Sequence, residues 1–463
     1  MISLTLAEVA VAAGGTLRDA DPQAPVTGLS TDSRELAPGS LFVALPGSRT
    51  DGARYAGQAL AAGAVACLAR PGAVADGPRV EVADPLAGLA AVAGEVRARS
   101  GARVVGITGS VGKTTTKDLL AAVLAGRFET VANLASFNNE VGLPLTLARL
   151  EPTTEALVVE MGARGPGHIA MLAGLARPGV GVVLNVGEAH LGVYGSREAI
   201  AAAKAELVEA LPRDGVAVLN ADDPLVAAMA ARTSARVVTF GLGAGAQVRA
   251  EGVELDGQGR ALFRLAAGDR GADVALPAVG EHLVPDALAA AAAAGVLGMG
   301  PEEVAAGLRG ASLSPARMQV TRRADGLTVI NDAYNANPTS MVAGLKALAA
   351  AGRHGRRTVA VLGEMAELGE TAVAEHDRIG RLVARLGIDR LVGVGELGEV
   401  IVRAARMEGM WPEEAAAAAD PDAALAALAV LAHPGDVVLV KASRVVALDR
   451  VADRLLGAPG GSG

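Results

Sequence analysis

One short segment of the sequence, VVGITGSVGKTTTKDLLAAVLAG, combines residue types that suit the binding of nucleotide phosphates. Its apolar start leads into Gly106, Gly109 and Gly112, and Lys113 and Thr114 follow directly. Backbone N–H groups in such a turn converge on phosphate oxygens, the lysine places a positive charge on the terminal phosphates, and the threonine hydroxyl can bind magnesium. Five residues rather than the usual four separate the outer glycines, yet the strand pattern before the turn and the helix pattern after it favour a phosphate loop.

Two further polar residues follow apolar runs that are typical of strands. Glu160 ends the run ALVVE, and His190 follows the run VVLNVGEA. Ligands of doubly wound sheets bind at the carboxyl ends of the strands, so Glu160 is the first candidate magnesium ligand and His190 lies along the same edge. A solvated carboxylate and a structural histidine are the alternative interpretations. Lys204 lies in the helical pattern AIAAAKAEL, where the residues alone indicate a solvated lysine.

The elements that must position these residues alternate from Val104 onward between short apolar runs and Ala-rich helical stretches, which is typical of βαβ units and a mainly parallel sheet. Four such runs, RVVGIT, ALVVEMG, GVGVVLNVG and GVAVLNADDP, predict a doubly wound nucleotide-binding sheet. Residues 247–280 alternate with period two around the turn DGQG, which predicts an antiparallel excursion. A helix is predicted from about Pro285 to Leu297.

The pattern predicts an α/β protein of three domains. Residues 1–100, with the strand-like LFVAL and AVACLA, form a small N-terminal α/β domain, and residues 101–313 form the central phosphate-loop domain with its antiparallel excursion. Residues 314–463 carry the strand patterns TVINDAY, TVAVLGEM, RLVGVG and DVVLVKAS between helices, which predicts a C-terminal Rossmann-like domain.

Composition excludes several classes of protein. Hydrophobic residues make up 51% of the chain but aromatic residues only 2%, so Ala, Val and Leu must fill closely packed α/β layers. Lys+Arg 42 against Asp+Glu 50 gives a net charge of −8, which argues against a nucleic-acid partner. The single cysteine, Cys67, excludes an intrachain disulfide or thiolate metal cluster. Without a basic leader or a long apolar run, we expect a cytoplasmic protein with no membrane insertion.

The order of several motifs resembles the Mur ligase family of peptidoglycan synthesis. These motifs are TDSR, GSLFVALPG, GITGSVGKTTTKD, ANLASFNNEVGLPLTL, EMGARGPGHI, NVGEAHL, AKAEL, NADDP, DAYNANPTSM, VLGEMAELG and VKASR. The resemblance implies an ATP- and Mg²⁺-dependent ligase that activates a carboxylate as an acyl phosphate, joins it to an amine, and releases ADP and phosphate. The strings MGARGPGHI and NDAYNANPTSM are similar to those of the member that adds D-alanyl-D-alanine to UDP-N-acetylmuramoyl-tripeptide. The alternatives are a Mur-type ligase that adds a single amino acid, and a P-loop phosphotransferase or nucleotide hydrolase.

The resemblance also implies roles for the domains and for individual residues. The first domain would bind the UDP part of the substrate, the second would bind ATP, and the third would bring in the dipeptide and close the site, in a protein that we expect to be a monomer. The residues expected on the UDP-substrate side are Ser33, Arg34, Gly47, Asn138, Asn139 and Glu140. Those expected on ATP are Thr108, Gly109, Ser110, Val111, Gly112, Lys113, Thr114, Thr115, Asp286, Arg317, Asp332 and Asn335. The dipeptide side would hold Asn337, Lys441 and Ser443.

The catalytic and metal-binding roles implied by the resemblance centre on four residues. Lys113, Glu160, His190 and Lys204 are the expected catalytic residues. Magnesium would be bound by Thr114, Glu160, His190 and Lys204, the last because it aligns with a lysine that becomes carbamylated in related ligases. One departure concerns adenine: the family string HNxxNA is replaced by HLVPDA, so Asp286 is expected to accept a hydrogen bond from the adenine amino group in place of an asparagine.

Overall fold

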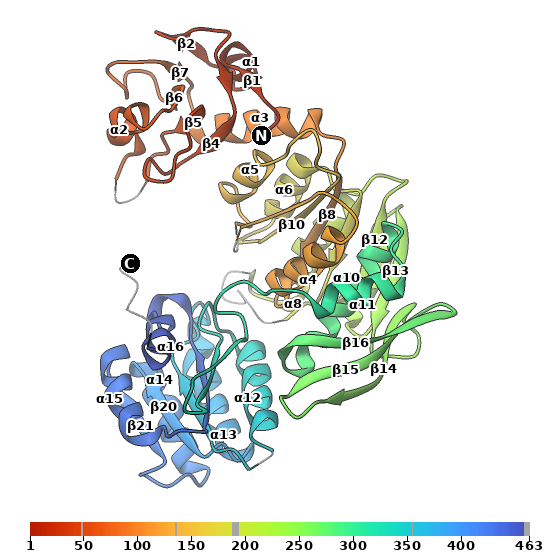
Figure 1. The fold of residues 1–463 in the computed structure, drawn as a ribbon, viewed down its shortest axis with the longest axis vertical. Coiled ribbons are helices and arrows are strands. Elements are labelled where there is room, and N and C mark those ends of the chain that lie inside the picture. Colours follow the sequence, from red (N-terminus) through yellow and green to blue (C-terminus); the bar gives the residue numbers. More distant parts are fainter. Residues whose placement is uncertain (48–49, 135–136, 188–193, 354, 458–463) are drawn as a thin grey trace.

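The computed structural model describes residues 1–47, 50–134, 137–187, 194–353 and 355–457. In these ranges the chain forms three α/β units, each built on its own main sheet, which follow one another along the longest axis of the molecule (Figure 1). The predicted fold class is confirmed. No helix in the described ranges is long and apolar enough to span a membrane.

The N-terminal unit holds a mixed five-stranded sheet. Its elements are β1 (Leu4–Thr5), α1 (Leu6–Ala12), β2 (Thr16–Arg18), β3 (Pro25–Val26), β4 (Gly28–Ser30), β5 (Ser40–Val43), α2 (Ala56–Ala61), β6 (Ala66–Ala69), β7 (Arg79–Glu81) and α3 (Pro85–Arg99). The strand order is β2-β7-β6-β5-β4, with β4 to β7 parallel. Asp84 starts α3 by accepting a hydrogen bond from the Leu86 N–H, as an N-cap residue does. The helix then packs against two helices of the central unit.

The central unit carries a nine-stranded sheet in the order β16-β15-β14-β13-β12-β11-β8-β10-β9. The strands are β8 (Arg103–Thr108), β9 (Thr130–Ala132), β10 (Ala156–Glu160), β11 (Val180–Val183), β12 (Val216–Asn220), β13 (Arg236–Gly241), β14 (Val248–Leu255), β15 (Arg260–Ala267) and β16 (Arg270–Val279). The helices are α4 (Lys113–Ala125), α5 (Gly142–Leu147), α6 (His168–Ala176), α8 (Arg197–Glu209), α9 (Pro224–Ala227), α10 (Val284–Val296) and α11 (Pro301–Arg309). The helix predicted from about Pro285 to Leu297 is thus α10, displaced by one residue.

Alanine lets the helices of the central unit come close to the sheet and to one another. Every residue of α10 from Ala287 to Ala294 is buried, and this helix packs against both α4 and the strands β12 to β14. A helix that is apolar on all sides belongs in a protein interior. The low aromatic content therefore reflects thin layers that small side chains fill, as the composition predicted.

The antiparallel excursion predicted for residues 247–280 is confirmed as the strands β14, β15 and β16. Its far end also contacts the third unit. Val279 lies in one hydrophobic cluster with Ile330 and Met341, and a Cβ on Gly280 would lie 3.5 Å from Cβ of Ala347. The excursion therefore forms part of the surface on which the third unit rests.

The C-terminal unit is a six-stranded sheet in the order β17-β18-β22-β19-β20-β21, parallel except for β17. The strands are β17 (Gln319–Arg322), β18 (Thr328–Asn331), β19 (Thr358–Leu362), β20 (Arg390–Val394), β21 (Ala415–Ala418) and β22 (Val437–Lys441). The helices are α12 (Pro338–Gly352), α13 (Ala372–Arg385), α14 (Glu396–Met407), α15 (Pro421–Leu431) and α16 (Asp449–Leu455). The four predicted strands are present, and β17 and β21 are additional.

Candidate active site

The predicted phosphate loop lies between β8 and α4. Gly112 has φ +84, and a Cβ at this position would come within 2.1 Å of Oδ1 of Asp286, so only glycine fits there. The same glycine is the N-cap residue of α4 and offers no side chain to the N–H groups of the first turn. A helix N-terminus without a side-chain cap, opening directly from a glycine-rich turn, is a donor set that suits a phosphate anion.

An asparagine that the sequence analysis did not single out holds the other half of this loop. Oδ1 of Asn185 accepts hydrogen bonds from the Ser110 N–H at 3.1 Å and the Val111 N–H at 3.0 Å, and its Nδ2 donates to the Val111 carbonyl at 3.1 Å. Asn185 follows β11, the parallel neighbour of β8. The signal that could have found it is its place after a strand next to the one that enters the loop.

Lys113 folds back over the loop that precedes it. Its Nζ donates to the Gly109 carbonyl at 2.7 Å. Burial lowers the pKa of this amine, and Arg317 lowers it further, whereas the negative charge of Glu160 opposes the shift. A positive charge held in this position is best satisfied by an anion in the loop.

Glu160 is the meeting point of three segments. Its Oε2 accepts from the Thr114 hydroxyl at 2.8 Å, and its Oε1 accepts from Nδ2 of Asn138 at 2.6 Å. The hydroxyl of Thr114 in turn accepts from Nη2 of Arg317 at 3.2 Å. The carboxylate is 1% exposed, so it is not the solvated strand-end acid of the alternative interpretation. The structure thus brings two predicted magnesium ligands together and places Arg317, a residue expected on ATP, beside them.

The other two predicted metal ligands have different outcomes. Lys204 on α8 is only 6% exposed, so the interpretation as a solvated lysine, made from the residues alone, is wrong. Burial, with Lys113 as a second cause, lowers its pKa to about 7. His190 lies outside the described residues. In the described ranges no group of three or more His, Cys, Asp and Glu side chains stands close enough together to hold a metal ion.

Asp286 lies against the phosphate loop, with its carboxyl group facing Gly112. It is 8% exposed, and burial raises its pKa from the usual 3.8 to about 8. At neutral pH the protonated form therefore predominates, which lets the side chain sit beside the loop without repelling a phosphate. Its expected contact with adenine stays a prediction.

The raised pKa of Asp286 predicts a pH-dependent stability. Between about pH 4 and about pH 8 the folded chain keeps a proton on Asp286 that the unfolded chain has lost, so this carboxyl lowers the free energy of unfolding as the pH rises through that window. Asp286→Asn, which cannot ionise, is expected to show a smaller decrease in melting temperature from pH 5 to pH 8 than the unchanged chain. Parallel melting curves over that range test this, and identical slopes would contradict it.

In the third unit the predicted residues gather at the carboxyl ends of β18 and β22. Nζ of Lys441, which is 1% exposed, lies 2.5 Å from Oδ2 of Asp332 and donates to the Asn335 carbonyl at 3.0 Å. The Met318 N–H donates to Oδ1 of Asp332 at 3.1 Å. Met318 follows Arg317 directly, and Arg317 contacts Thr114. The Asp332–Lys441 group of the third unit is therefore connected to the phosphate-loop site through two consecutive residues.

The remaining predicted residues of the third unit hold its backbone. Asn337 caps α12 by accepting from the Ser340 N–H at 2.9 Å. The hydroxyl of Ser443 accepts from the Ala366 N–H at 2.8 Å and donates to the Ala336 carbonyl at 3.3 Å. Both residues thus shape the loops beside Lys441.

Three sequence models of one family match the chain in the order of these units. Those of the Mur ligase family catalytic domain, the Mur ligase middle domain and the Mur ligase glutamate ligase domain match residues 25–107, 107–294 and 316–444. The chain is also 49% identical over 500 residues to the UDP-N-acetylmuramoyl-tripeptide–D-alanyl-D-alanine ligase of Mycobacterium tuberculosis, with 98% of both chains covered. The chain belongs to the Mur ligase family.

Solved structures agree with this assignment over nearly the whole chain. MurF from Acinetobacter baumannii is similar with a TM-score of 0.87 at 31% identity, covering 98% of this chain and 99% of that one. MurF from Thermotoga maritima, solved in complex with ADP, is similar with a TM-score of 0.81 at 30% identity, covering 93% and 97%. The resemblance inferred from the motifs is confirmed.

The Mur ligase residues expected on the UDP-substrate side fall in two places. Ser33 and Arg34 follow β4 and Gly47 follows β5, its parallel neighbour, so both segments leave the same edge of the N-terminal sheet. Ser33 donates to Gln58 at 3.3 Å, whereas Arg34 is exposed and pairs with Asp32.

The second group of expected substrate residues lies in the central unit. Oδ1 of Asn139 accepts from the Gly142 N–H at 2.8 Å at the start of α5, and Glu140 is partly exposed beside it. Asn138 contacts Glu160. The structure thus brings Asn138 to the phosphate-loop site but not Ser33, Arg34 or Gly47.

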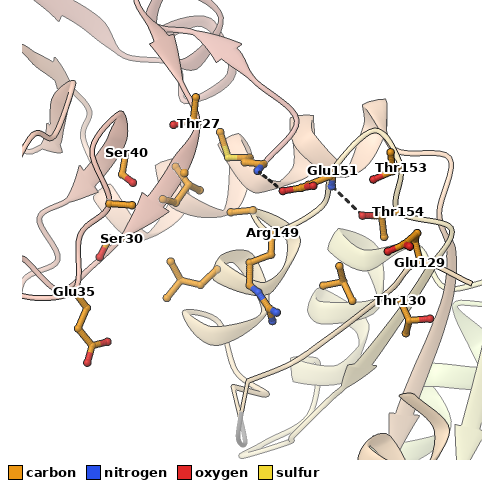
Figure 2. Close-up of a pocket in the computed structure, with 17 residues that line it drawn as sticks. Thr27, Ser30, Glu35, Ser40, Glu129, Thr130, Arg149, Glu151, Thr153 and Thr154 are labelled. Carbon is orange, nitrogen blue, oxygen red and sulfur yellow. Dashed lines mark hydrogen bonds and ion pairs between the residues drawn. The ribbon is translucent and has the colours of Figure 1, made fainter. Parts of the chain in front are cut away.

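A separate pocket of about 500 Å³ lies between the N-terminal and central units of this Mur ligase (Figure 2). It is open between Thr27 and Ser30, before and at the end of β4, and Glu129 and Thr130, at the point where β9 begins. None of the residues that the sequence predicted for the site lines it. The pocket lies beside the segments of the first unit that are expected on the UDP-substrate side, rather than at the phosphate loop.

Proposed function

We propose that the chain is an ATP-dependent ligase that joins D-alanyl-D-alanine to the terminal carboxylate of UDP-N-acetylmuramoyl-tripeptide in peptidoglycan precursor synthesis. The observation that carries the proposal is the contact of Thr114 with both Glu160 and Arg317, because it joins a phosphate loop, an acid and the third unit at one point. The match over the whole length to a relative of that name supports the choice of substrates.

The residues at the phosphate loop suit ATP and magnesium. The N–H groups at the start of α4 and the amine of Lys113 hold the terminal phosphates, and Thr114 and Glu160 offer the hydroxyl and carboxylate oxygens that magnesium prefers. A carbamylated Lys204 would add a further carboxylate oxygen on the metal side, and His190, which lies outside the described residues, is the remaining ligand that the resemblance implies. Magnesium, when bound, neutralises charge on the transferring phosphoryl group.

A carboxylate and an amine do not form an amide without activation of the carboxylate, so the reaction proceeds in two steps. An oxygen of the tripeptide carboxylate attacks the γ-phosphorus of ATP, ADP leaves, and an acyl phosphate forms. The dipeptide amine then attacks the acyl carbon, the C–O bond to phosphate breaks, and the amide forms with loss of phosphate and a proton. Lys113 stabilises the charge that develops in the first step.

The three units divide the substrates between them. The N-terminal unit, with Ser33, Arg34 and Gly47, binds the UDP part. The central unit binds ATP, and Asn138, Asn139 and Glu140 face the tripeptide. The third unit brings Asp332 and Asn335 to the nucleotide, and Asn337, Lys441 and Ser443 lie on the dipeptide side. The acyl phosphate hydrolyses if water reaches it, which favours closure of the third unit over the filled site. We place the reaction in the cytoplasm and expect a monomer.

The decisive test is magnesium-dependent release of ADP with UDP-N-acetylmuramoyl-tripeptide and either D-alanyl-D-alanine, D-alanine or no amine. Release is expected to require the dipeptide, and the product is expected to gain the mass of the dipeptide less one water. Release with D-alanine and a matching product mass would point to a ligase for single amino acids. Release without any amine, and without a new amide, would point to a phosphotransferase or nucleotide hydrolase.

A further inference from the structure

A buried ion pair lies one turn into the phosphate-loop helix, on two residues to which no role has been assigned so far. Lys117 and Asp118 are consecutive on α4, with side chains 3% and 10% exposed, and Nζ lies 2.8 Å from Oδ1. Buried pairs of this kind contribute little net stability, because desolvation of both charges offsets their attraction. The other contacts of the two side chains therefore matter more than the stability of the pair itself.

Lys117 is connected through Asn133 to both the backbone and the side chain of Glu160. Its Nζ donates to the Asn133 carbonyl at 2.9 Å, and Oδ1 of Asn133 accepts from the Glu160 N–H at 2.6 Å. Nδ2 of the same asparagine donates to the Phe137 carbonyl, directly before Asn138, which donates to the Glu160 carboxylate. One lysine thus fixes the residue that orients Glu160 from both sides.

Asp118 leads in the opposite direction, to the linker between the central and third units. Its Oδ2 accepts from the Ser314 N–H at 2.7 Å. Three residues further along the linker, Arg317 donates to the Thr114 hydroxyl, which donates to Glu160. The contacts of Lys117 and those of Asp118 therefore both reach Glu160. The residues connected in this way are Thr114, Lys117, Asp118, Asn133, Glu160, Ser314 and Arg317.

We propose that Lys117 and Asp118 are positioning residues that couple the Glu160 carboxylate to the linker of the third unit, so that the metal side of the site and the approach of that unit are set together. The proposal rests on the function proposed above, because it assigns Glu160 to magnesium. Coupling of this kind is reciprocal. A magnesium nucleotide in the central unit should therefore order the linker, and a loosened linker should weaken magnesium binding.

The test uses the full chain, ADP and magnesium, and needs neither tripeptide nor dipeptide. Two readouts are taken: the magnesium concentration at which ADP binding is half-maximal, by calorimetry, and the hydrogen exchange of peptides that cover residues 312–318. Lys117→Met removes the contact on the Glu160 side, and Asp118→Ala removes the contact on the linker side. Arg357→Met, which breaks the ion pair with Asp436 in the third unit, is the control for general loss of stability.

Coupling predicts that each variant moves the readout of the opposite side. Asp118→Ala is expected to raise the required magnesium concentration about 10- to 100-fold, the usual effect of losing a residue that orients a metal ligand. Lys117→Met is expected to speed exchange in the linker and to abolish its slowing by ADP and magnesium. Arg357→Met should lower the melting temperature and leave both readouts unchanged.

Results that move each readout only from its own side, or neither readout, would overturn the proposal. If Lys117→Met does not fold, Asp118→Ala decides the question by itself, because this variant changes the linker side and the magnesium requirement reports on the Glu160 side. If each variant changes the readout of the opposite side but ADP release does not depend on the dipeptide, the coupling is supported and the proposed ligase function is contradicted. If ADP release depends on the dipeptide but no variant changes the readout of the opposite side, the ligase function is supported and the coupling is contradicted.

Discussion

Lys113→Ala is expected to lower dipeptide-dependent ADP release about 100- to 1,000-fold, while the affinity for UDP-N-acetylmuramoyl-tripeptide stays nearly unchanged. The amine lies over the phosphate loop, bonded to the Gly109 carbonyl, where it meets the charge that develops on the transferring phosphoryl group. Loss of one such preorganised group commonly costs about 100- to 1,000-fold in rate. Initial rates of ADP release and calorimetric titration with the tripeptide substrate measure the two quantities separately.

Lys346→Ala is the matched control, because Lys346 on α12 is an exposed lysine with no assigned role. It is expected to behave like the unchanged chain in both measurements. Loss of tripeptide binding together with turnover in Lys113→Ala would contradict the division of substrates between the first two units. Retention of turnover would remove the phosphate loop from the mechanism.

Local patterns predicted much of the fold because each depended on neighbours along the chain. The phosphate loop was recognisable from its glycines and lysine, and the antiparallel excursion from its alternation and its DGQG turn. The strand β21 was not, because its four residues are all alanine, which favours a helix by intrinsic propensity. It pairs with β20 at the edge of the sheet and lies against α14 and α15, so strand pairing and packing against these two helices override the local preference.

The site was predicted less completely, for a related reason. Asn185 and Asn133 act through contacts with segments distant in sequence, and the motifs that contain them do not indicate which of their residues make those contacts. The residues alone indicated a solvated lysine at position 204, and only the family resemblance gave Lys204 a metal-binding role, because an Ala-rich helix with one lysine is the pattern of an exposed face as well as of a covered one. Only the packing of α8 against β11 and β8 decides between the two.

The burial of Lys204 leads to the second large effect that we predict. Lys204→Ala is expected to lower dipeptide-dependent turnover about 100- to 1,000-fold, as the loss of a preorganised charge does, and added formate or acetate is expected to restore part of it. A carbamate on this lysine would be a carboxylate anion, so a small carboxylate that enters the vacated space can replace it. Rates measured against carboxylate concentration give the result.

The pH dependence of the unchanged enzyme provides an independent check on the same role. A carbamate forms when the neutral amine attacks carbon dioxide, with loss of one proton, and the protonated amine does not react. Because burial and Lys113 lower the pKa of Lys204 to about 7, the neutral fraction grows as the pH rises through that value. Turnover is therefore expected to fall below about pH 7, and to fall at higher pH as well when carbon dioxide and bicarbonate are removed.

Lys113→Ala distinguishes the carbamate role from a general effect of added salt. Its lost group is a cation that faces phosphate, so formate and acetate are expected to leave its activity unchanged. Equal rescue of both variants would indicate an effect of ionic strength, and absence of rescue in Lys204→Ala at any concentration would contradict the carbamate. Burial and the neighbouring charge of Lys113 make the Lys204 amine costly to protonate, and its conversion to an anion replaces the repulsion of a second cation with attraction to Lys113.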